Sequence, residues 1–145
     1  MLHLLVLFHV FGATIWVGGH LILSLTILPK ALKENNPDLI LQFEKNYEKI
    51  GLPALLLQVI TGIWLSLLYI PFSDWFTLAT PHYRFLWIKL GLLLATITLA
   101  IHARFFILPK LSKHNLQTLA FHILLVTLLA VSFVITGLSF RYAYF

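Results

Sequence analysis

The segment Leu4–Leu28 decides the fold; it reads LLVLFHVFGATIWVGGHLILSLTIL and has no formally charged residue in its 25 positions. Because about 20 apolar residues in a helix cross the hydrocarbon core of a bilayer, this segment predicts a membrane-spanning helix. His9 and His20 lie eleven residues apart inside it, which at about 100° per residue places both on nearly the same side of the helix. Gly12 and Trp16 lie between them on that side. Ionisable residues inside a span usually belong to a functional site, so this side is predicted to hold a ligand.

The composition is that of an integral membrane protein. Of the 145 residues, 60% are hydrophobic and 10% are charged, whereas soluble domains carry roughly 25% charged residues. The chain has no cysteine and only one methionine, Met1, which excludes disulfides, thiolate metal sites and c-type haem attachment. The apolar run near the start is longer than a signal-peptide core and lacks a basic leader, so we expect the first helix to be retained.

Three further apolar segments are long enough to cross a membrane. Together with the first they predict four spans, at residues 4–28, 50–70, 85–108 and 116–140. Short to moderate connections between consecutive spans favour an up-and-down arrangement. The predicted fold is therefore an all-α, integral membrane four-helix bundle in a single domain, residues 1–145.

The connections carry most of the polar residues. Residues 30–49 predict a polar loop, with room for a short amphipathic helix that has Tyr47 on its apolar side. Pro53 is predicted to lie in the first turn of the second span, where its missing backbone N–H is tolerated. Residues 71–84 are rich in aromatic side chains, as expected of a segment at the membrane surface.

Two short sequences occur twice. Residues 27–30 read ILPK and recur at 107–110, and residues 59–62 read VITG and recur at 134–137. These matches indicate a duplicated helix pair; the alternative is chance similarity in an apolar sequence.

Lysine and arginine residues near the span ends predict the orientation. Cytoplasmic ends of spans carry an excess of these residues, and the basic residues here flank spans rather than forming a nucleic-acid-binding patch. The side that holds both termini has three, and the opposite side has seven, so the opposite side is predicted to be cytoplasmic and both termini to face outward. The two sets are Arg84, Lys89 and Arg141, and Lys30, Lys33, Lys45, Lys49, Arg104, Lys110 and Lys113.

Three histidines inside the spans are predicted to lie at one depth. His20 precedes Pro29 by about 13 Å along a helix axis, and His102 and His122 lie about 10 Å inside their spans. The first and third helices are diagonal in an up-and-down bundle, so His20 and His102 are predicted to face each other across the core. The small residues Gly91, Ala95 and Thr98 share the helix face of His102, and we expect that face to point inward.

This arrangement suits b-type haem with His20 and His102 as axial ligands. Arg104 would pair with a haem propionate, and His122 would act as a supporting or alternative ligand. The competing interpretation is a copper or zinc site formed by His20, His102 and His122, since neutral imidazoles suit these metals. A third interpretation is that the histidines only form hydrogen bonds between helices.

A second cluster is predicted near the other membrane surface. His9 and Lys89 lie at similar depth on the first and third spans, with Arg84, His82 and Arg141 nearby. The functional interpretation is a site for an anionic ligand, such as the carboxylates of a porphyrin, a quinol or a second haem. The alternative is a lysine whose ammonium extends to the membrane surface.

Three motifs carry a family resemblance over nearly the whole chain. His9-(x6)-Trp16-Val-Gly-Gly, Leu52-Pro53-Ala54-(x6)-Thr61-Gly62 and Trp87-Ile88-Lys89-Leu90 resemble the CopD superfamily of small four-helix membrane proteins. The resemblance implies copper uptake or delivery in a bacterial inner membrane. The superfamily also includes the similar HemJ proteins, which bind b-type haem and are implicated in protoporphyrinogen oxidation. The HemJ resemblance implies roles for His9, Trp16 and Lys89.

From these observations we expect a haem b protein that acts in electron transfer or oxidation, as a membrane oxidoreductase or a carrier. The alternative is a copper-binding or copper-transport protein that uses the same histidines, and a third reading is a structural membrane subunit. The expected partners are the lipid bilayer, a quinol, a porphyrin or a redox protein, and a second copy of the chain. Nothing in the sequence indicates nucleic-acid binding.

Overall fold

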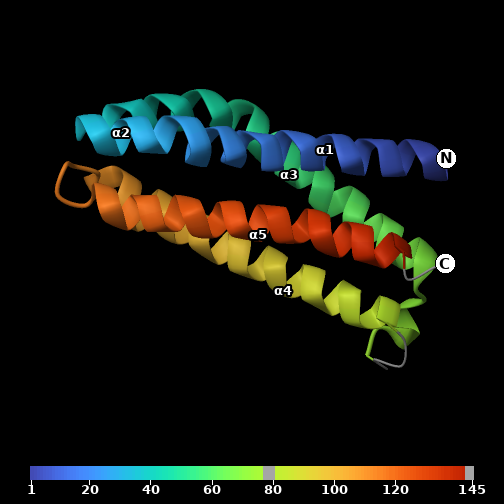
Figure 1. The fold of residues 1–145 in the computed structure, drawn as a ribbon. Coiled ribbons are helices and arrows are strands. Elements are labelled where there is room, and N and C mark those ends of the chain that lie inside the picture. The colour runs from blue at the N-terminus through green and yellow to red at the C-terminus, as the bar shows by residue number, and fades with distance from the viewer. Residues whose placement is uncertain (77–80, 143–145) are drawn as a thin grey trace.

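The computed structural model describes residues 1–76 and 81–142, with no side-chain detail for residues 81–82 and 140–142, and within this part every regular element is helical (Figure 1). Four long helical segments confirm the predicted all-α four-helix fold. The elements are α1 (Leu2–Ile22), a π-helical turn (Leu23–Ile27), α2 (Leu28–Glu34), α3 (Asp38–Tyr69), a short 3-10 turn (Phe72–Asp74), α4 (Pro81–His102), a second π-helical turn (Ala103–Ile107), a 3-10 turn (Leu108–Lys110) and α5 (Leu116–Tyr142).

Four helices have the length and apolar composition of membrane spans. They are Leu2–Glu34, Asp38–Tyr69, Tyr83–Lys110 and Leu116–Ser139. Their outer faces carry large exposed apolar side chains, among them Leu25 and Leu94, which lipid accepts. The chain is therefore a multi-pass membrane protein.

The helices associate as two pairs. α1 packs against α3, α4 packs against α5, and α5 also packs against α1. Figure 1 shows the two pairs as two layers, with the start of α1 and the end of α5 at the same end of the bundle. This is the predicted up-and-down order, in which α1 and α4 are diagonal.

The predicted polar loop at residues 30–49 is wrong in its extent, because most of this stretch is helical. The connection shrinks to a turn in which Asn35 adopts the left-handed conformation (φ 49°, ψ 43°) and the Asn36 N–H donates to the Ala31 carbonyl at 2.9 Å. Asparagine tolerates this conformation better than most residues. α3 then starts at Asp38, and Ile40 is fully buried, so apolar contacts hold this polar segment in a helix.

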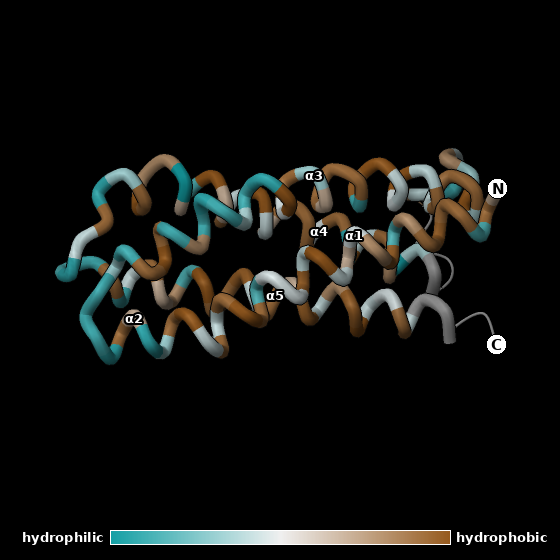
Figure 2. Tube along the Cα trace, turned by 90° about the horizontal axis from the view of Figure 1, so that it is seen from above, coloured by the Kyte–Doolittle hydropathy of each residue, from teal (hydrophilic) through white to brown (hydrophobic). Residues whose placement is uncertain are grey.

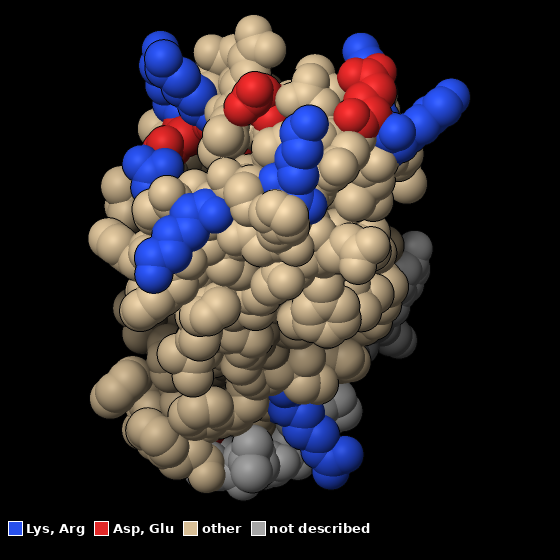
Figure 3. Space-filling view, turned by 90° about the vertical axis from the view of Figure 1, so that its left-hand side faces the viewer, with Lys and Arg blue, Asp and Glu red and all other residues tan. Residues whose placement is uncertain are grey.

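The charged residues gather at the end of the bundle that carries α2. Figure 2 shows this end as the most hydrophilic part of the backbone trace. Figure 3 views the molecule from this end, and most of the charged side chains in view lie toward one edge of that face. Charged residues at the end of long apolar helices match a bundle whose central part lies in lipid.

Prolines shape three of the spans. Pro53 lies inside α3 rather than in its first turn as predicted, and Figure 1 shows α3 changing direction along its length, as expected where a proline interrupts a helix. Pro29 and Pro109 each follow a π-helical turn. A proline ring clashes with the carbonyl four residues earlier in a regular α-helix, and a π turn changes the hydrogen-bond register there. Both ILPK sequences therefore adopt the same local solution.

Glycines allow α1 and α3 to approach closely. A Cβ atom on Gly12 would lie 2.9 Å from the Ala54 carbonyl oxygen, and one on Gly19 would overlap the ring of Tyr47. On the other side of that ring, a Cβ on Gly51 would lie 2.6 Å from it. The Tyr47 ring is thus held between a glycine of α1 and a glycine of α3.

We predict that Gly19→Ala lowers the free energy of unfolding by about 1–3 kcal/mol, because the added methyl group overlaps the Tyr47 ring. Gly18→Ala is the matched control, since a Cβ there meets no atom within 4 Å; it should leave stability unchanged or raise it by up to about 1 kcal/mol. Thermal unfolding of both variants in detergent, followed by circular dichroism, measures the difference. Equal stability of the two variants would contradict the packing described here.

Candidate functional site

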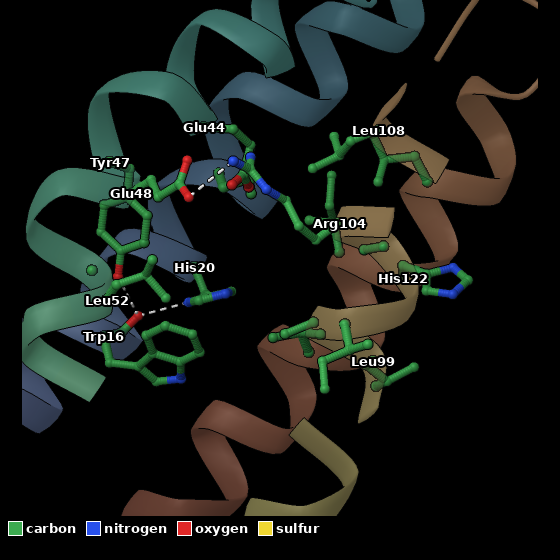
Figure 4. A pocket seen from close by; sticks show the side chains of 18 of the residues that line it. Trp16, His20, Glu44, Tyr47, Glu48, Leu52, Leu99, Arg104, Leu108 and His122 are labelled. Carbon is green, nitrogen blue, oxygen red and sulfur yellow. Dashed lines mark hydrogen bonds and ion pairs between the residues drawn. The ribbon is translucent and has the colours of Figure 1, made fainter. Parts of the chain in front are cut away.

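A cavity of about 280 Å³ lies between the four spans. All four contribute to its wall, which is mainly apolar; Figure 4 shows Trp16 and His20 of α1 pointing toward Leu99 of α4. Its volume lies just below the range of about 300–1,000 Å³ that is typical of small-molecule pockets. The polar lining residues are His20, Tyr47, Glu44, Glu48, Arg104 and His122.

His20 is held in one orientation by backbone contacts. Its Nδ1 lies 2.8 Å from the Trp16 carbonyl oxygen, and because a carbonyl only accepts, Nδ1 carries the hydrogen. The Tyr47 hydroxyl donates to the carbonyls of Ile15 and Trp16 at 3.0 and 3.2 Å. The Nε2 lone pair of His20 therefore remains available, which is the state in which a histidine binds a metal or accepts a proton.

The Trp16 indole belongs to the same cluster. Its ring centroid lies 4.4 Å from that of His20, and its Nε1–H is buried without a hydrogen-bond partner in the described part of the chain. The family resemblance placed Trp16 with His9 and Lys89, whereas the structure places it beside His20.

An ion pair lies at the edge of the cavity. Arg104 Nη2 and Glu48 Oε1 are 3.2 Å apart, and their side chains are 57% and 36% exposed. The contact joins α3 to the π-helical turn after α4, so it connects the two helix pairs. Arg104, predicted to pair with a haem propionate, has a carboxylate of this chain as its partner. Sequence reasoning did not single out Glu44 and Glu48, although their spacing of four residues places both on the side of α3 that also bears Gly51 and Leu52.

His102 and His122 form a second histidine site. His102 Nδ1 and His122 Nε2 are 3.0 Å apart, and the two rings are nearly parallel, with centroids separated by 5.0 Å. His122 Nδ1 lies 2.9 Å from the Thr118 carbonyl oxygen. Nδ1 of His122 must then carry a hydrogen, so its Nε2 accepts a hydrogen from His102 Nδ1. The His102 Nε2 lone pair is left open at the end of this chain of hydrogen bonds.

The structure brings together only two of the three predicted ligands. His102 is exposed and does not line the cavity that contains His20, and in Figure 4 the His122 ring points away from His20. Within residues 1–76 and 81–142 no group of three or more His, Cys, Asp or Glu side chains is arranged to hold a metal ion. Ligation of one haem by both residues would need His20 and His102 on opposite faces of the porphyrin ring. Their placement does not fit this, because His102 does not line the cavity that contains His20.

The small-residue face of α4 was expected to point into the bundle, and the structure shows it pointing outward. Gly91, Thr98 and His102 are exposed, and Ala95 is half-buried, so this face points out of the bundle. The side of α4 that turns inward carries Thr96, which is 1% exposed. Small residues mark sites of close helix contact in membranes but do not distinguish contacts within one chain from contacts between chains.

The second predicted cluster is present in part. His9 Nδ1 lies 2.9 Å from Thr61 Oγ1, and because that hydroxyl donates to the Leu57 carbonyl at 2.6 Å, the imidazole donates to the hydroxyl. Lys89 is half-buried on α4. Arg84 is exposed at the start of α4. The side chains of His82 and Arg141 lie outside the described residues.

The comparison with protein families gives one match. The family described as copper resistance protein D, CopD, matches residues 41–140. The chain belongs to the CopD family. The match covers all of α4 and most of α3 and α5, including His102, Arg104 and His122. No curated protein and no solved structure matches the chain.

We predict that His20 and His122 are both protonated on Nδ1, because each Nδ1 faces a backbone carbonyl. Two-dimensional NMR that correlates imidazole nitrogens with ring protons distinguishes the two neutral tautomers. The exposed His114, on the 111–115 connection, supplies the reference signal of a solvated imidazole. Signals of an Nε2-protonated ring at either position would contradict the assignment of the hydrogen bonds.

Proposed function

We propose that this CopD-family membrane protein binds a copper ion through His102 and His122. The observation that supports the proposal is the contact of the two imidazoles, whose nitrogens point at each other at 3.0 Å. Imidazole nitrogens are suitable ligands for copper, and the chain offers no thiolate in their place. Among the described residues, no two histidines face each other across the cavity as a pair of haem ligands would.

Each histidine has a distinct part in this proposal. The Thr118 carbonyl holds His122 with its Nε2 toward His102, and such a contact behind a ligating nitrogen fixes ring orientation and raises ligand basicity. His102 is exposed, and its ring also stacks on Phe106, with centroids 5.5 Å apart. A metal ion between the rings would take the place of the hydrogen that His102 Nδ1 donates to His122 Nε2. His102 would then carry its hydrogen on Nε2.

The charge distribution supports an orientation in the membrane. The end of the bundle at α2 carries most of the lysine and arginine side chains, and such ends face the cytoplasm. In a bacterial inner membrane both termini would then face outward. The His102–His122 pair lies between the membrane centre and the cytoplasmic surface in this orientation.

Copper binding is tested on protein purified in detergent and loaded with a defined copper ion. We expect His102→Ala and His122→Ala each to weaken binding by at least about tenfold, the scale on which loss of a ligand-supporting contact weakens metal sites. His3→Ala and His114→Ala are matched controls, because both residues are exposed and lie outside the pair; they should bind as the unaltered protein does. Unchanged binding in both pair variants would contradict the proposal.

A second candidate function rests on the cavity. The fixed orientation of His20, with Nε2 open toward the mainly apolar cavity, supports a haem that would have His20 as its protein ligand. Absorption spectra of the same purified sample, oxidised and reduced, test it. A Soret band that His20→Ala abolishes and His102→Ala leaves intact is the expected result, and a sample without that band contradicts this candidate while leaving the copper proposal to its own test.

A further inference from the structure

His102 occupies an unusual place for a membrane histidine. Ionisable residues inside spans almost always face the interior of a bundle or a water-filled cavity. His102 is exposed on the outer side of α4, and its ring stacks on Phe106 and His122. A single copy of the chain therefore presents this imidazole toward lipid, which is unfavourable unless another molecule covers it.

A shallow apolar groove continues from His102 along the same face. Gly91, Ala95, Thr98 and His102 are spaced so that about 100° per residue returns them to one stripe of α4. The groove between this stripe and α5 has a volume of about 490 Å³, and Leu125 and Leu129 form its α5 side. Among the described residues nothing requires glycine at position 91, because a Cβ there meets none of their atoms within 4 Å. The space over Gly91 is room for a neighbouring helix.

The copper site proposed above is incomplete in one copy. Two imidazoles supply two ligands, and no third His, Cys, Asp or Glu joins them among the described residues. Small-residue stripes let helix backbones approach in membranes, and polar side chains beside them form contacts across the interface. The exposed stripe of α4 has both features, since Thr98 and His102 lie in it beside Gly91 and Ala95.

We propose that two copies of the chain associate through this α4–α5 groove about an axis along the membrane normal, so that the His102–His122 pairs of both copies hold one copper ion. The shared ion rests on the proposed copper function; the association itself does not. Identical copies with the same orientation place His102 at the same depth, so an axis of this kind brings the two pairs together. A different partner would have to supply matching ligands at that depth.

The absence of cysteine makes the association directly testable. We introduce Ala95→Cys or Thr98→Cys in the groove and Leu25→Cys or Ile60→Cys on exposed positions of the other helix pair. Membranes treated with a copper-free oxidant should give a cross-linked dimer several-fold more readily from the groove variants. If the groove variants cross-link no more than the variants on the other helix pair, or not at all, the association is overturned. Lipid or a different protein then covers this face.

A bulky residue in the groove provides a second test. Gly91→Leu should abolish cross-linking at Thr98→Cys without lowering thermal stability, because its side chain fills the open space that the second copy would occupy. Gly18→Leu is the matched control, since position 18 is also open; it should leave cross-linking unchanged. Cross-linking that survives Gly91→Leu overturns the proposed contact.

Copper stoichiometry separates the two parts of the proposal. One ion per two chains, lost together with the dimer in Gly91→Leu, supports the shared site. One ion per chain, retained in Gly91→Leu, overturns the shared site and leaves the copper function intact. If the groove variants cross-link in chelator-treated membranes but the purified protein binds no copper, the association is supported and the copper function is overturned. Failure of the association and failure of the copper function are therefore distinguishable.

Discussion

The scarcity of water in the hydrocarbon core is the constraint on which the structure depends, because a polar group there must find its partner inside the protein. The hydroxyl-bearing residues meet this constraint locally. Thr14, Thr98 and Ser66 each donate to the carbonyl four residues earlier in their own helix, so exposed and half-buried hydroxyl groups are satisfied without a partner from another helix. Histidines use the same carbonyls, as His20 and His122 do. In the described part of the chain the buried side-chain polar atom left without a partner is Trp16 Nε1, beside His20.

Each of the two helix pairs positions one of the histidine sites. α1 and α3 are locked by the Tyr47 ring between Gly19 and Gly51 and by the Tyr47 hydroxyl on α1 carbonyls, which sets the position of His20. α4 and α5 are joined where His102 meets His122. Between the pairs lie the cavity and the exposed Arg104–Glu48 contact. Exposed ion pairs contribute about 0–1 kcal/mol, so packing of α1 on α5, rather than this contact, keeps the pairs together.

The number, order and membrane character of the helices could be predicted from the sequence, because a long apolar run has few alternatives to a membrane-spanning helix. The equal depth of His102 and His122 could also be predicted, because the number of residues from the end of a helix gives the depth along its axis. Rotation about the helix axis was harder to predict: the stripe of Gly91, Ala95 and Thr98 was expected to point inward, and it points outward. The length of α3 was missed because residues 38–49 are polar, and their helix depends on tertiary contacts such as that of Ile40 rather than on composition.

The π-helical turns absorb one extra residue without turning the helix segments on either side of them. The turn at Leu23–Ile27 lies between His20 and α2. Because its hydrogen bonds span five residues, the turn is wider by about one residue than an α-helical turn, so deleting one residue there would leave a regular α-helix with His20 and α2 in nearly the same relative rotation. A deletion in the regular part of α1 would instead rotate the residues on one side of it by about 100° relative to those on the other. The two π turns are therefore the places where a relative of the same fold gains or loses one residue while each histidine site keeps its position.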